Sequence, residues 1–356
     1  MIDLQKQYAS LKIELNNAIQ QCIDNAVFIG GKFVSNFEKN LSEYIGIQHT
    51  IGCGNGTDAL QIALMALNLP KGSKIIVPAF TYIAPVEVIK FLDFEVVFAD
   101  VDINTYNITL ENIQAVYTND VKAIIVVHLF GQICDIDKIY AFTQKNNIYL
   151  IEDNAQALGA EKHITRNTIM TTSFYPTKNL GAYGDGGAIF CNDDILAKCI
   201  RKIASHGQSE KYIHDIVGIN SRLDTLQAAI LQVKLPHLDT YNQQRKNNAT
   251  YYQTHLKDIA EIELPIATQP HIYHQYTIKV KNNLRDELRK HLASKKIDTI
   301  INYPLAAHQQ KAFLQTNIHL PNAESLCETA LSLPIYPELS EAQLSYICDS
   351  IKEFIK

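Results

Sequence analysis

A lysine in a glycine-rich stretch has the clearest chemical use in this chain. Lys178 lies in the run Ser173 to Gly187, with apolar and aromatic residues before it and four glycines after it. A shielded amine loses its proton more easily, because desolvation disfavours the ammonium form. A neutral lysine attacks carbonyl carbons and forms Schiff bases. The alternative is a surface lysine beside a glycine-rich hairpin. Other residues of the chain must decide between these two roles.

A carboxylate at the end of an apolar run is the second chemical group. Ile148 to Glu152 is typical of a buried parallel strand, and Asp153 follows it directly. Ligands of open α/β sheets bind at the carboxyl ends of strands, where Asp153 would stand. A pyridoxal phosphate enzyme needs such a carboxylate to keep the pyridine nitrogen protonated, so that the ring withdraws electrons. A helix cap is the alternative role.

A glycine-rich turn could bind a phosphate. Gly52 to Gly56 leads into the apolar, helix-forming run Ala59 to Leu67. Free amides and the helix dipole make a helix start a phosphate site, and Thr57 can add its hydroxyl. The turn is not GxGxxG and lacks a P-loop lysine, which argues against Rossmann and nucleotide triphosphate sites. An ordinary N-cap is the alternative, and Tyr82, after the apolar run 74–77, could stack on a cofactor ring or simply pack.

The glycine-rich turn, the aromatic residue, the strand-end aspartate and the lysine follow one another in a specific order. With these features the chain resembles the DegT/DnrJ/EryC1/StrS sugar aminotransferases over essentially its whole length. The matching stretches are Gly54 to Ala59, Pro78 to Ala84, His128 to Gln132, Glu152 to Gln156, Ser173 to Gly187 and Gly218 to Ala229. The resemblance implies the α/β fold of fold-type-I pyridoxal phosphate transferases. A large αβα domain with a mostly parallel sheet would precede a smaller C-terminal α/β domain. Between Glu161 and Asn167 the chain has no glycine, where the family usually has a glycine-containing loop.

The resemblance implies a role for each residue around the cofactor ring. Lys178 would bind pyridoxal 5'-phosphate as a Schiff base, and Asp153 would pair with the pyridinium nitrogen. Gln156 would bond the phenolic oxygen, and Tyr82 would stack on the ring. No metal is expected, because the histidines and cysteines lack metal-ligand spacing.

The phosphate and the sugar would be held by further residues that the resemblance implies. Gly56, Thr57 and Ser173 would hold the phosphate, and Asn220 would reach it from the neighbouring subunit. The protein would therefore be a homodimer with shared active sites. A looser motif places three residues near the sugar: Tyr183, Tyr303 and His308.

The resemblance further implies transfer of an amino group from L-glutamate to C3 of a nucleotide-linked keto sugar. Freed Lys178 would move the proton, and two half-reactions at one site imply ping-pong kinetics. Phe174 to Gly187 and His128 to Gln132 resemble the C3 subgroup, so the predicted substrate is a dTDP-3-keto-6-deoxyhexose. The product would be an amino sugar nucleotide for lipopolysaccharide, O-antigen or other glycans. A UDP-linked 3-keto sugar and a C4-specific enzyme are alternatives.

Two other classes of protein are weaker alternatives. A non-catalytic regulatory protein could use the same fold without turnover, although no DNA-binding or partner module supports it. Related pyridoxal phosphate sugar dehydratases resemble this chain but have histidine in place of Lys178, which argues against that activity.

Composition excludes several other classes. The 356 residues, 47% hydrophobic, suffice for a large domain at 1–236 and a small domain at 237–356. A net charge of −5 provides no basic field for nucleic acid. No apolar run approaches the roughly 18 residues of a membrane span, and the start of the chain is not a signal peptide. Seven cysteines without CxxC pairs indicate free thiols and a cytoplasmic protein.

Alternating elements are predicted to position these residues. A polar helix over roughly 4–25 precedes strands at 74–77, 95–98, 123–127 and 148–152, with helices between them. Leu223 to Leu235 is predicted to be a core-facing helix, with a stripe of Leu223, Leu226, Ile230 and Val233. A long polar helix from Asp239 to Leu256 opens the small domain, and Pro265 to Pro270 is predicted to be a connector within it.

Overall fold

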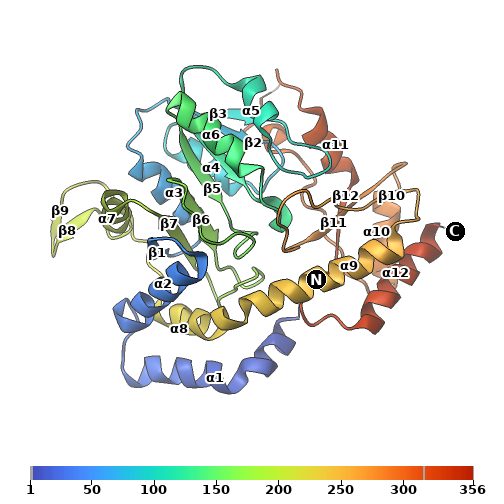
Figure 1. Cartoon of the computed structure of the whole chain (residues 1–356), viewed down its shortest axis with the longest axis horizontal. Coiled ribbons are helices and arrows are strands. Elements are labelled where there is room, and N and C mark those ends of the chain that lie inside the picture. The colour runs from blue at the N-terminus through green and yellow to red at the C-terminus, as the bar shows by residue number, and fades with distance from the viewer. Residues whose placement is uncertain (1–2, 316, 356) are drawn as a thin grey trace.

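The computed structural model describes residues 3–315 and 317–355 (Figure 1). Its centre, within these residues, is a seven-stranded sheet. The strands are β1 His49–Cys53, β2 Lys74–Pro78, β3 Glu95–Ala99, β4 Val121–Val127, β5 Tyr149–Asp153, β6 Ile169–Ser173 and β7 Gly187–Cys191. Their order is β1-β7-β6-β5-β4-β2-β3, and β7 runs antiparallel to the other six, which share one direction. The predicted, mostly parallel sheet is confirmed.

Strand residues pack alternately on the two faces of this sheet. Ile75 and Val77 belong to one core cluster, whereas Ile76 between them belongs to another. Successive side chains of a strand point to opposite faces, so a strand buried on both faces has a continuous apolar sequence. This is why the four strands predicted from apolar runs are all present. Strands β1 and β6 carry a weaker apolar signal, whereas the apolar run of β7, Ala188 to Cys191, directly follows the glycine-rich stretch.

Helices cover both faces of the sheet, which makes the large unit an αβα sandwich (Figure 1). One cluster includes residues of α3 Gly56–Ala66, α4 Ala84–Phe91, α7 Asp194–Ile203 and α11 Pro321–Thr329. The other includes residues of α5 Leu110–Val116 and α6 Ile136–Asn146. The short elements of this unit are the helix η1 Leu129–Gly131 and the hairpin strands β8 Gln208–Glu210 and β9 Ile213–His214.

The predicted core-facing helix after Leu223 is buried on two sides. It is α8 Thr225–Lys234, which lies beside α2 Gly31–Ile45 and beside α1 Leu4–Asp24, the long helix along the bottom of Figure 1. Ala228 and Leu231 pack into the core, whereas Ile230 contacts the cluster of Leu11 and Leu15 on α1. The prediction is confirmed for the helix, but α1 covers part of the predicted stripe.

The C-terminal unit is a smaller α/β layer. Its antiparallel sheet has β10 Ile262–Glu263, β11 Tyr276–Val280 and β12 Ala330–Leu333. After η2 Leu235–His237, helix α9 Leu238–Leu256 runs from the large unit to this sheet, which also packs on α10 Arg285–Ser294 and α12 Glu341–Ile355 (Figure 1). Residues of η3 Ala307–Gln309 and α11, however, pack into the core of the large sheet. The bounds 1–236 and 237–356 therefore remain a prediction about domains, while the later part of the chain contributes to both cores.

Two sequence-based expectations concern the chain as a whole. All seven cysteines lie in the described part of the chain and are free, as predicted. Across residues 3–315 and 317–355, no helix is both long and apolar enough to cross a membrane.

Candidate active site

The carboxyl edge of the parallel strands gathers the predicted chemical groups. Asp153 ends β5, Ser173 ends β6, and Tyr82 lies in the loop after β2. Parallel strands end at the same edge, so residues far apart in sequence meet there. Lys178 lies in the loop that follows Ser173, where its amide donates a hydrogen bond to the Tyr175 carbonyl oxygen at 2.8 Å. The arrangement matches the place where α/β proteins bind ligands.

Lys178 and Asp153 influence each other electrostatically. Burial lowers the pKa of the Lys178 amine, and the charge of Asp153 opposes this shift. Burial raises the pKa of Asp153, whereas the Ala155 amide and the charge of Lys178 lower it. The carboxylate Oδ1 accepts the Ala155 N–H at 3.0 Å, and Oδ2 has no hydrogen-bond partner among the described residues. A free carboxylate oxygen therefore stands within electrostatic range of an amine whose pKa is lowered by desolvation.

The start of α3 forms a narrow cradle with the end of β6. A Cβ on Gly56 would lie 2.7 Å from the Ser173 Cβ, so only glycine fits without a shift of the neighbouring strand. The Asn55 side chain caps the Asp58 amide at 2.8 Å. The Gly56 and Thr57 amides have no partner in the part of the chain that the structure describes, so they remain available to an anion. Gly56, Thr57 and Ser173 are thus brought together as predicted for a phosphate site.

Gln156 and two tyrosines lie in the neighbourhood of Asp153, whose charge acts on Tyr303. The Gln156 Oε1 accepts the Phe130 amide at 2.7 Å, and its Nε2 faces the Tyr303 hydroxyl at 3.4 Å. The Tyr303 ring lies 6.4 Å from the ring of Tyr82, which is 58% exposed. Gln156 therefore presents an amide donor, and Tyr82 keeps a surface on which another ring could stack.

Two predicted sugar-contacting residues make their contacts with groups other than Lys178 and Asp153. Tyr183 packs under α1 and α8, with its ring 6.4 Å from that of Tyr8 and 4.1 Å from the Lys234 Nζ. His308 is buried, and its Nε2 lies 3.1 Å from a Glu324 carboxylate oxygen. None of the contacts of these two side chains within the described residues involves Lys178 or Asp153. Their contact with a sugar remains a prediction.

Asn220 is exposed, and its side chain makes no hydrogen bond within the described part of the chain. The neighbouring Ser221 hydroxyl donates to Asp58 at 2.7 Å and accepts the Gly54 amide at 2.9 Å, both at the α3 start of the same subunit. The segment is thus tied to the phosphate cradle while Asn220 itself faces outward. A role for Asn220 in a partner's site stays a prediction.

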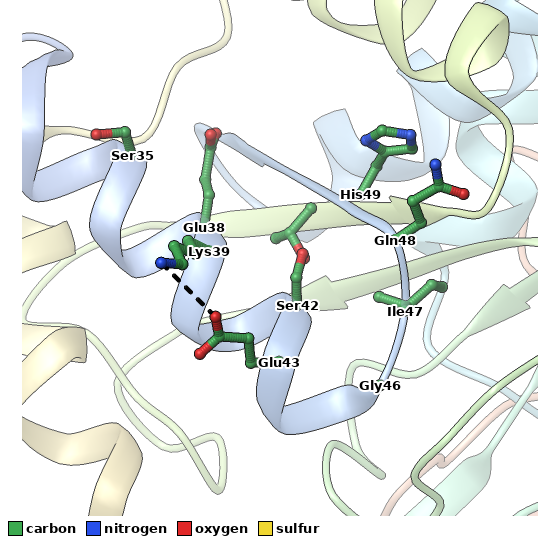
Figure 2. A pocket seen from close by; sticks show the side chains of 10 residues that line it. Ser35, Glu38, Lys39, Ser42, Glu43, Gly46, Ile47, Gln48 and His49 are labelled. Carbon is green, nitrogen blue, oxygen red and sulfur yellow. Dashed lines mark hydrogen bonds and ion pairs between the residues drawn. The ribbon is translucent and has the colours of Figure 1, made fainter.

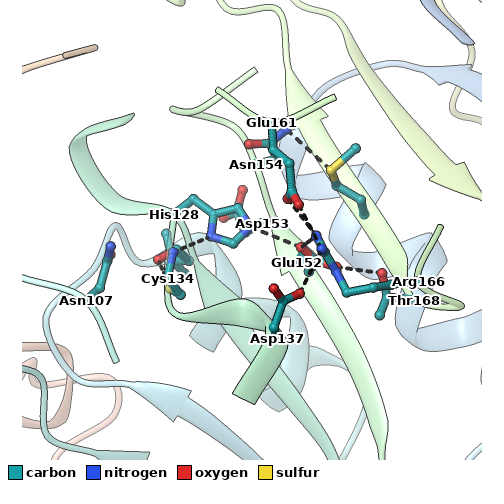
Figure 3. A network of polar contacts seen from close by, with 12 residues as sticks. Asn107, His128, Cys134, Asp137, Glu152, Asp153, Asn154, Glu161, Arg166 and Thr168 are labelled. Carbon is teal, nitrogen blue, oxygen red and sulfur yellow. Dashed lines mark hydrogen bonds and ion pairs between the residues drawn. The ribbon is translucent and has the colours of Figure 1, made fainter. Parts of the chain in front are cut away.

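A buried ionic network braces the strand ends behind Asp153 (Figure 3). Glu152 accepts hydrogen bonds from Thr168 at 2.6 Å and from the Arg166 Nη2 at 3.2 Å, and its Oε2 lies 3.2 Å from the His128 Nε2. Arg166 also holds Glu161 through both terminal nitrogens, at 2.8 and 2.6 Å. Arg166 and Glu161 both lie in the glycine-free segment Glu161 to Asn167. Ion pairs therefore hold this segment.

A polar pocket between α2 and β1 is separate from these groups (Figure 2). Glu38, Lys39, Glu43 and His49 are among its lining residues, and Lys39 pairs with Glu43 at 3.8 Å. None of the predicted site residues lines it. We therefore assign it no part in the chemistry. No group of three or more potential metal ligands occurs in the described ranges.

The fold and the lysine–aspartate pair define a pyridoxal phosphate-dependent transferase of fold type I. A family model described as the DegT/DnrJ/EryC1/StrS aminotransferase family matches residues 9–352, and the chain belongs to this family. Its members depend on pyridoxal phosphate. Among solved structures, S. venezuelae DesV is similar with a TM-score of 0.96 and 33% identity, over 99% of this chain and 97% of that one. The predicted fold class is confirmed.

Three curated relatives are similar over nearly their whole length. A "pleiotropic regulatory protein" of Geobacillus stearothermophilus is 42% identical over 100% of this chain and 98% of its own. A UDP-N-acetyl-3-dehydro-α-D-glucosamine 3-aminotransferase of Acidithiobacillus ferrooxidans is 41% identical over 99% and 96%. A dTDP-3-amino-3,6-dideoxy-α-D-galactopyranose transaminase of Aneurinibacillus thermoaerophilus is 38% identical over 99% and 98%.

The residues of this chain fit the cofactor that the family uses. The phosphate matches the cradle at Gly56, where a Cβ would collide with Ser173, and the free amides of the α3 start. The ring nitrogen matches the free oxygen of the buried Asp153 carboxylate, and the aldehyde matches the amine of Lys178. Each part of the cofactor thus has a suitable group on the protein.

The structure also shows supporting residues to which sequence reasoning gave no role. His128 lies in a stretch that carried the resemblance, and its amide donates to the Asp153 carbonyl oxygen at 3.0 Å. Asn179 directly follows Lys178 and bonds to Asn242 and His274. The signal for Asn179 was its place in the Lys178 stretch, whereas nothing local pointed to His274.

Proposed function

We propose that this aminotransferase moves an amino group from L-glutamate to C3 of a nucleotide-linked 3-keto sugar. The observation that carries the chemistry is the partly buried Lys178 amine, whose pKa is lowered by desolvation, within electrostatic range of the free Asp153 carboxylate oxygen and beside the open start of α3. C3 as the acceptor carbon is supported by the names of two relatives, which both specify position 3 of the sugar.

The residues of the chain divide the work between binding and proton transfer. Pyridoxal phosphate, when bound, supplies a ring that withdraws electrons from the substrate carbon. Asp153 stabilises positive charge at the ring nitrogen, and Gln156 offers its amide to the phenolic oxygen. The Lys178 amine takes the proton from the α-carbon of the amino donor in one half-reaction and delivers a proton to C3 of the sugar in the other. Its lowered pKa leaves more of the neutral amine that can act as a base.

The nucleotide can be thymidine or uridine diphosphate. We keep dTDP-3-keto-6-deoxyhexose as the predicted substrate, because a dTDP-sugar transaminase is 38% identical over 99% of this chain. A UDP-linked 3-keto sugar is the second candidate, because a UDP-sugar 3-aminotransferase is 41% identical over the same share.

A substrate panel tests this function. Purified protein with L-glutamate is offered dTDP- and UDP-linked 3-keto sugars and their 4-keto isomers, and amino sugar products are quantified by mass spectrometry. We expect kcat/KM for the 3-keto sugars to exceed that for the 4-keto isomers by at least ~10²-fold, about 2.7 kcal/mol of transition-state binding. A preferred 4-keto sugar would contradict the assignment to C3. Cofactor bound to Lys178 without turnover of any sugar would instead favour a regulatory role, which the name of one relative suggests.

We further propose a homodimer in which Asn220 completes the partner's phosphate site. The support is its exposed position next to Ser221, which bonds to Asp58 at the α3 start. A two-fold dimer would then build two equivalent sites from one self-complementary surface.

Mixing two inactive variants tests this sharing. Lys178→Ala mixed with a severely impaired Asn220→Ala variant should regain activity after subunit exchange, approaching half the wild-type value per mixed dimer. One site of each mixed dimer then holds both defects, and the other holds neither. The matched control mixes Lys178→Ala with Asp153→Asn, where every site keeps one defect and no activity should return. If exchange is verified by mass and the first mixture stays inactive, Asn220 serves its own subunit.

A further inference from the structure

A chain of buried side-chain amides connects the Lys178 loop with the C-terminal unit. Asn179 follows Lys178 directly, and its Nδ2 donates to the Asn242 Oδ1 on α9 at 2.7 Å. The Asn242 Nδ2 in turn donates to the Leu158 carbonyl oxygen at 3.2 Å. On its other side, the Asn179 Oδ1 lies 2.8 Å from the Nδ1 of His274, which is 95 positions away in the sequence. All three side chains are buried, so their polar atoms depend on one another.

The hydrogen bond to Leu158 determines the donor and the acceptor of every other bond in this series. The Leu158 carbonyl oxygen can only accept, so the nitrogen of Asn242 must donate to it and the oxygen of Asn242 must accept. The nitrogen of Asn179 therefore donates to Asn242, and its oxygen is left to accept from His274. The proton of a neutral His274 must then be on Nδ1, which leaves Nε2 unprotonated.

His274, the last side chain in this series of hydrogen bonds, is neutral and has a well-anchored backbone. Burial, and then the charges of Lys178 and Arg245, hold the pKa of His274 well below its ordinary value. The Arg245 Nη1 donates to the carbonyl oxygens of His274 at 3.3 Å and Ile335 at 2.8 Å. The next amide, of Gln275, donates to the Phe130 carbonyl oxygen at 3.2 Å. The backbone of His274 is thus fixed to both units of the fold.

We propose that His274 is a positioning residue for Lys178, acting through Asn179. The hydrogen bonds from Leu158 to His274 hold the Asn179 side chain at both its nitrogen and its oxygen. They thereby keep the loop that carries Lys178 closed around the lysine amine. This inference rests on the proposed function, because it takes Lys178 to be the lysine that binds the cofactor. Loss of the His274 bond should loosen the loop and admit water to the amine, which then keeps its proton to a higher pH.

The test follows capture of pyridoxal phosphate by the cofactor-free protein, measured by absorbance as a function of pH. The capture rate reports the fraction of Lys178 that is neutral, because only the neutral amine attacks the aldehyde. Two variants of His274 differ in the bond that they keep. In His274→Asn the amide nitrogen takes the place of Nδ1 and can still donate to Asn179. In His274→Gln the amide nitrogen reaches only the place of Nε2, and the Asn179 oxygen loses its donor.

We expect the midpoint of the pH profile to rise by about one pH unit in His274→Gln, with roughly tenfold slower capture at pH 7, and to stay near wild type in His274→Asn. The other charged groups around Lys178 and His274 are Asp153 and Arg245, which neither variant changes. Equal profiles for the two variants would overturn the proposal, because a merely structural role would not depend on which nitrogen donates.

A second substitution keeps the test decisive if His274→Gln folds poorly. Asn179→Ala should raise the midpoint as His274→Gln does. His274→Ala, which removes the donor, should also raise the midpoint when it is introduced alone, but it should change nothing more when it is added to Asn179→Ala, because the shared contact is already lost. Additive shifts would overturn the proposal. Wild-type protein that captures no cofactor on Lys178 overturns the proposed function together with this inference, whereas normal wild-type capture with indistinguishable variants overturns the inference alone.

Discussion

Lys178→Ala is expected to lower the turnover of the keto sugar by at least ~10⁴-fold, because it removes both the group that binds the cofactor covalently and the base that moves the proton. The protein should remain folded. Burial lowers the pKa of Lys178, so the native state already disfavours its charge, and removal of the amine relieves that cost. Turnover is measured with saturating cofactor, and melting temperatures are compared without it.

Borohydride reduction of the wild-type protein identifies the lysine directly. Reduction should fix the cofactor on the peptide that contains Lys178, and the Lys178→Ala variant should carry no label there. Lys198→Ala, which changes an exposed lysine on α7, is the matched control and should keep both label and activity. Label on a different lysine of the wild-type protein would remove Lys178 from the active site.

Asp153→Asn is expected to lower kcat by at least ~10²-fold, about 2.7 kcal/mol of transition-state stabilisation, while cofactor still binds. An amide is nearly isosteric with the carboxylate and can still accept the Ala155 N–H, which now lies 3.0 Å from Oδ1. It carries no charge, however, and cannot stabilise a protonated ring nitrogen as a carboxylate does. Stopped-flow measurement of each half-reaction should show the loss in both, because both use the same ring.

Two comparisons separate this chemical role from a structural one. Asp93→Asn, at an exposed aspartate whose partner is Lys71, should leave kcat unchanged. The melting temperature of Asp153→Asn without cofactor should not fall, because burial already raises the pKa of this carboxyl and disfavours its charge. Near-normal kcat would show that Asp153 is only a cap for the Ala155 amide.

Much of the large domain could be predicted because its signals are local. The runs at 74–77, 95–98, 123–127 and 148–152 all became strands, since a strand buried on both faces is apolar throughout. The long helices were predicted at 4–25 and at Asp239 to Leu256, and they occur as Leu4–Asp24 and Leu238–Leu256. Strand β7 was not predicted, because it begins at Gly187 inside the glycine-rich stretch, and its pairing with β1 and β6 brings together residues far apart in the sequence.

By itself, the sequence determined the order of the glycine-rich turn, the strand-end Asp153 and the loop that carries Lys178, and with it the family and the cofactor. These features are encoded by adjacent residues, whose backbone geometry depends on short-range sterics and hydrogen bonds. Only the tertiary structure decided that Tyr303 meets Gln156 across 147 positions, and that His274 meets Asn179 across 95. It also placed Tyr183 against α1. Such contacts depend on how α9 and the C-terminal unit pack on the large sheet. This packing results from many buried contacts along the whole chain, so no single sequence motif predicts it.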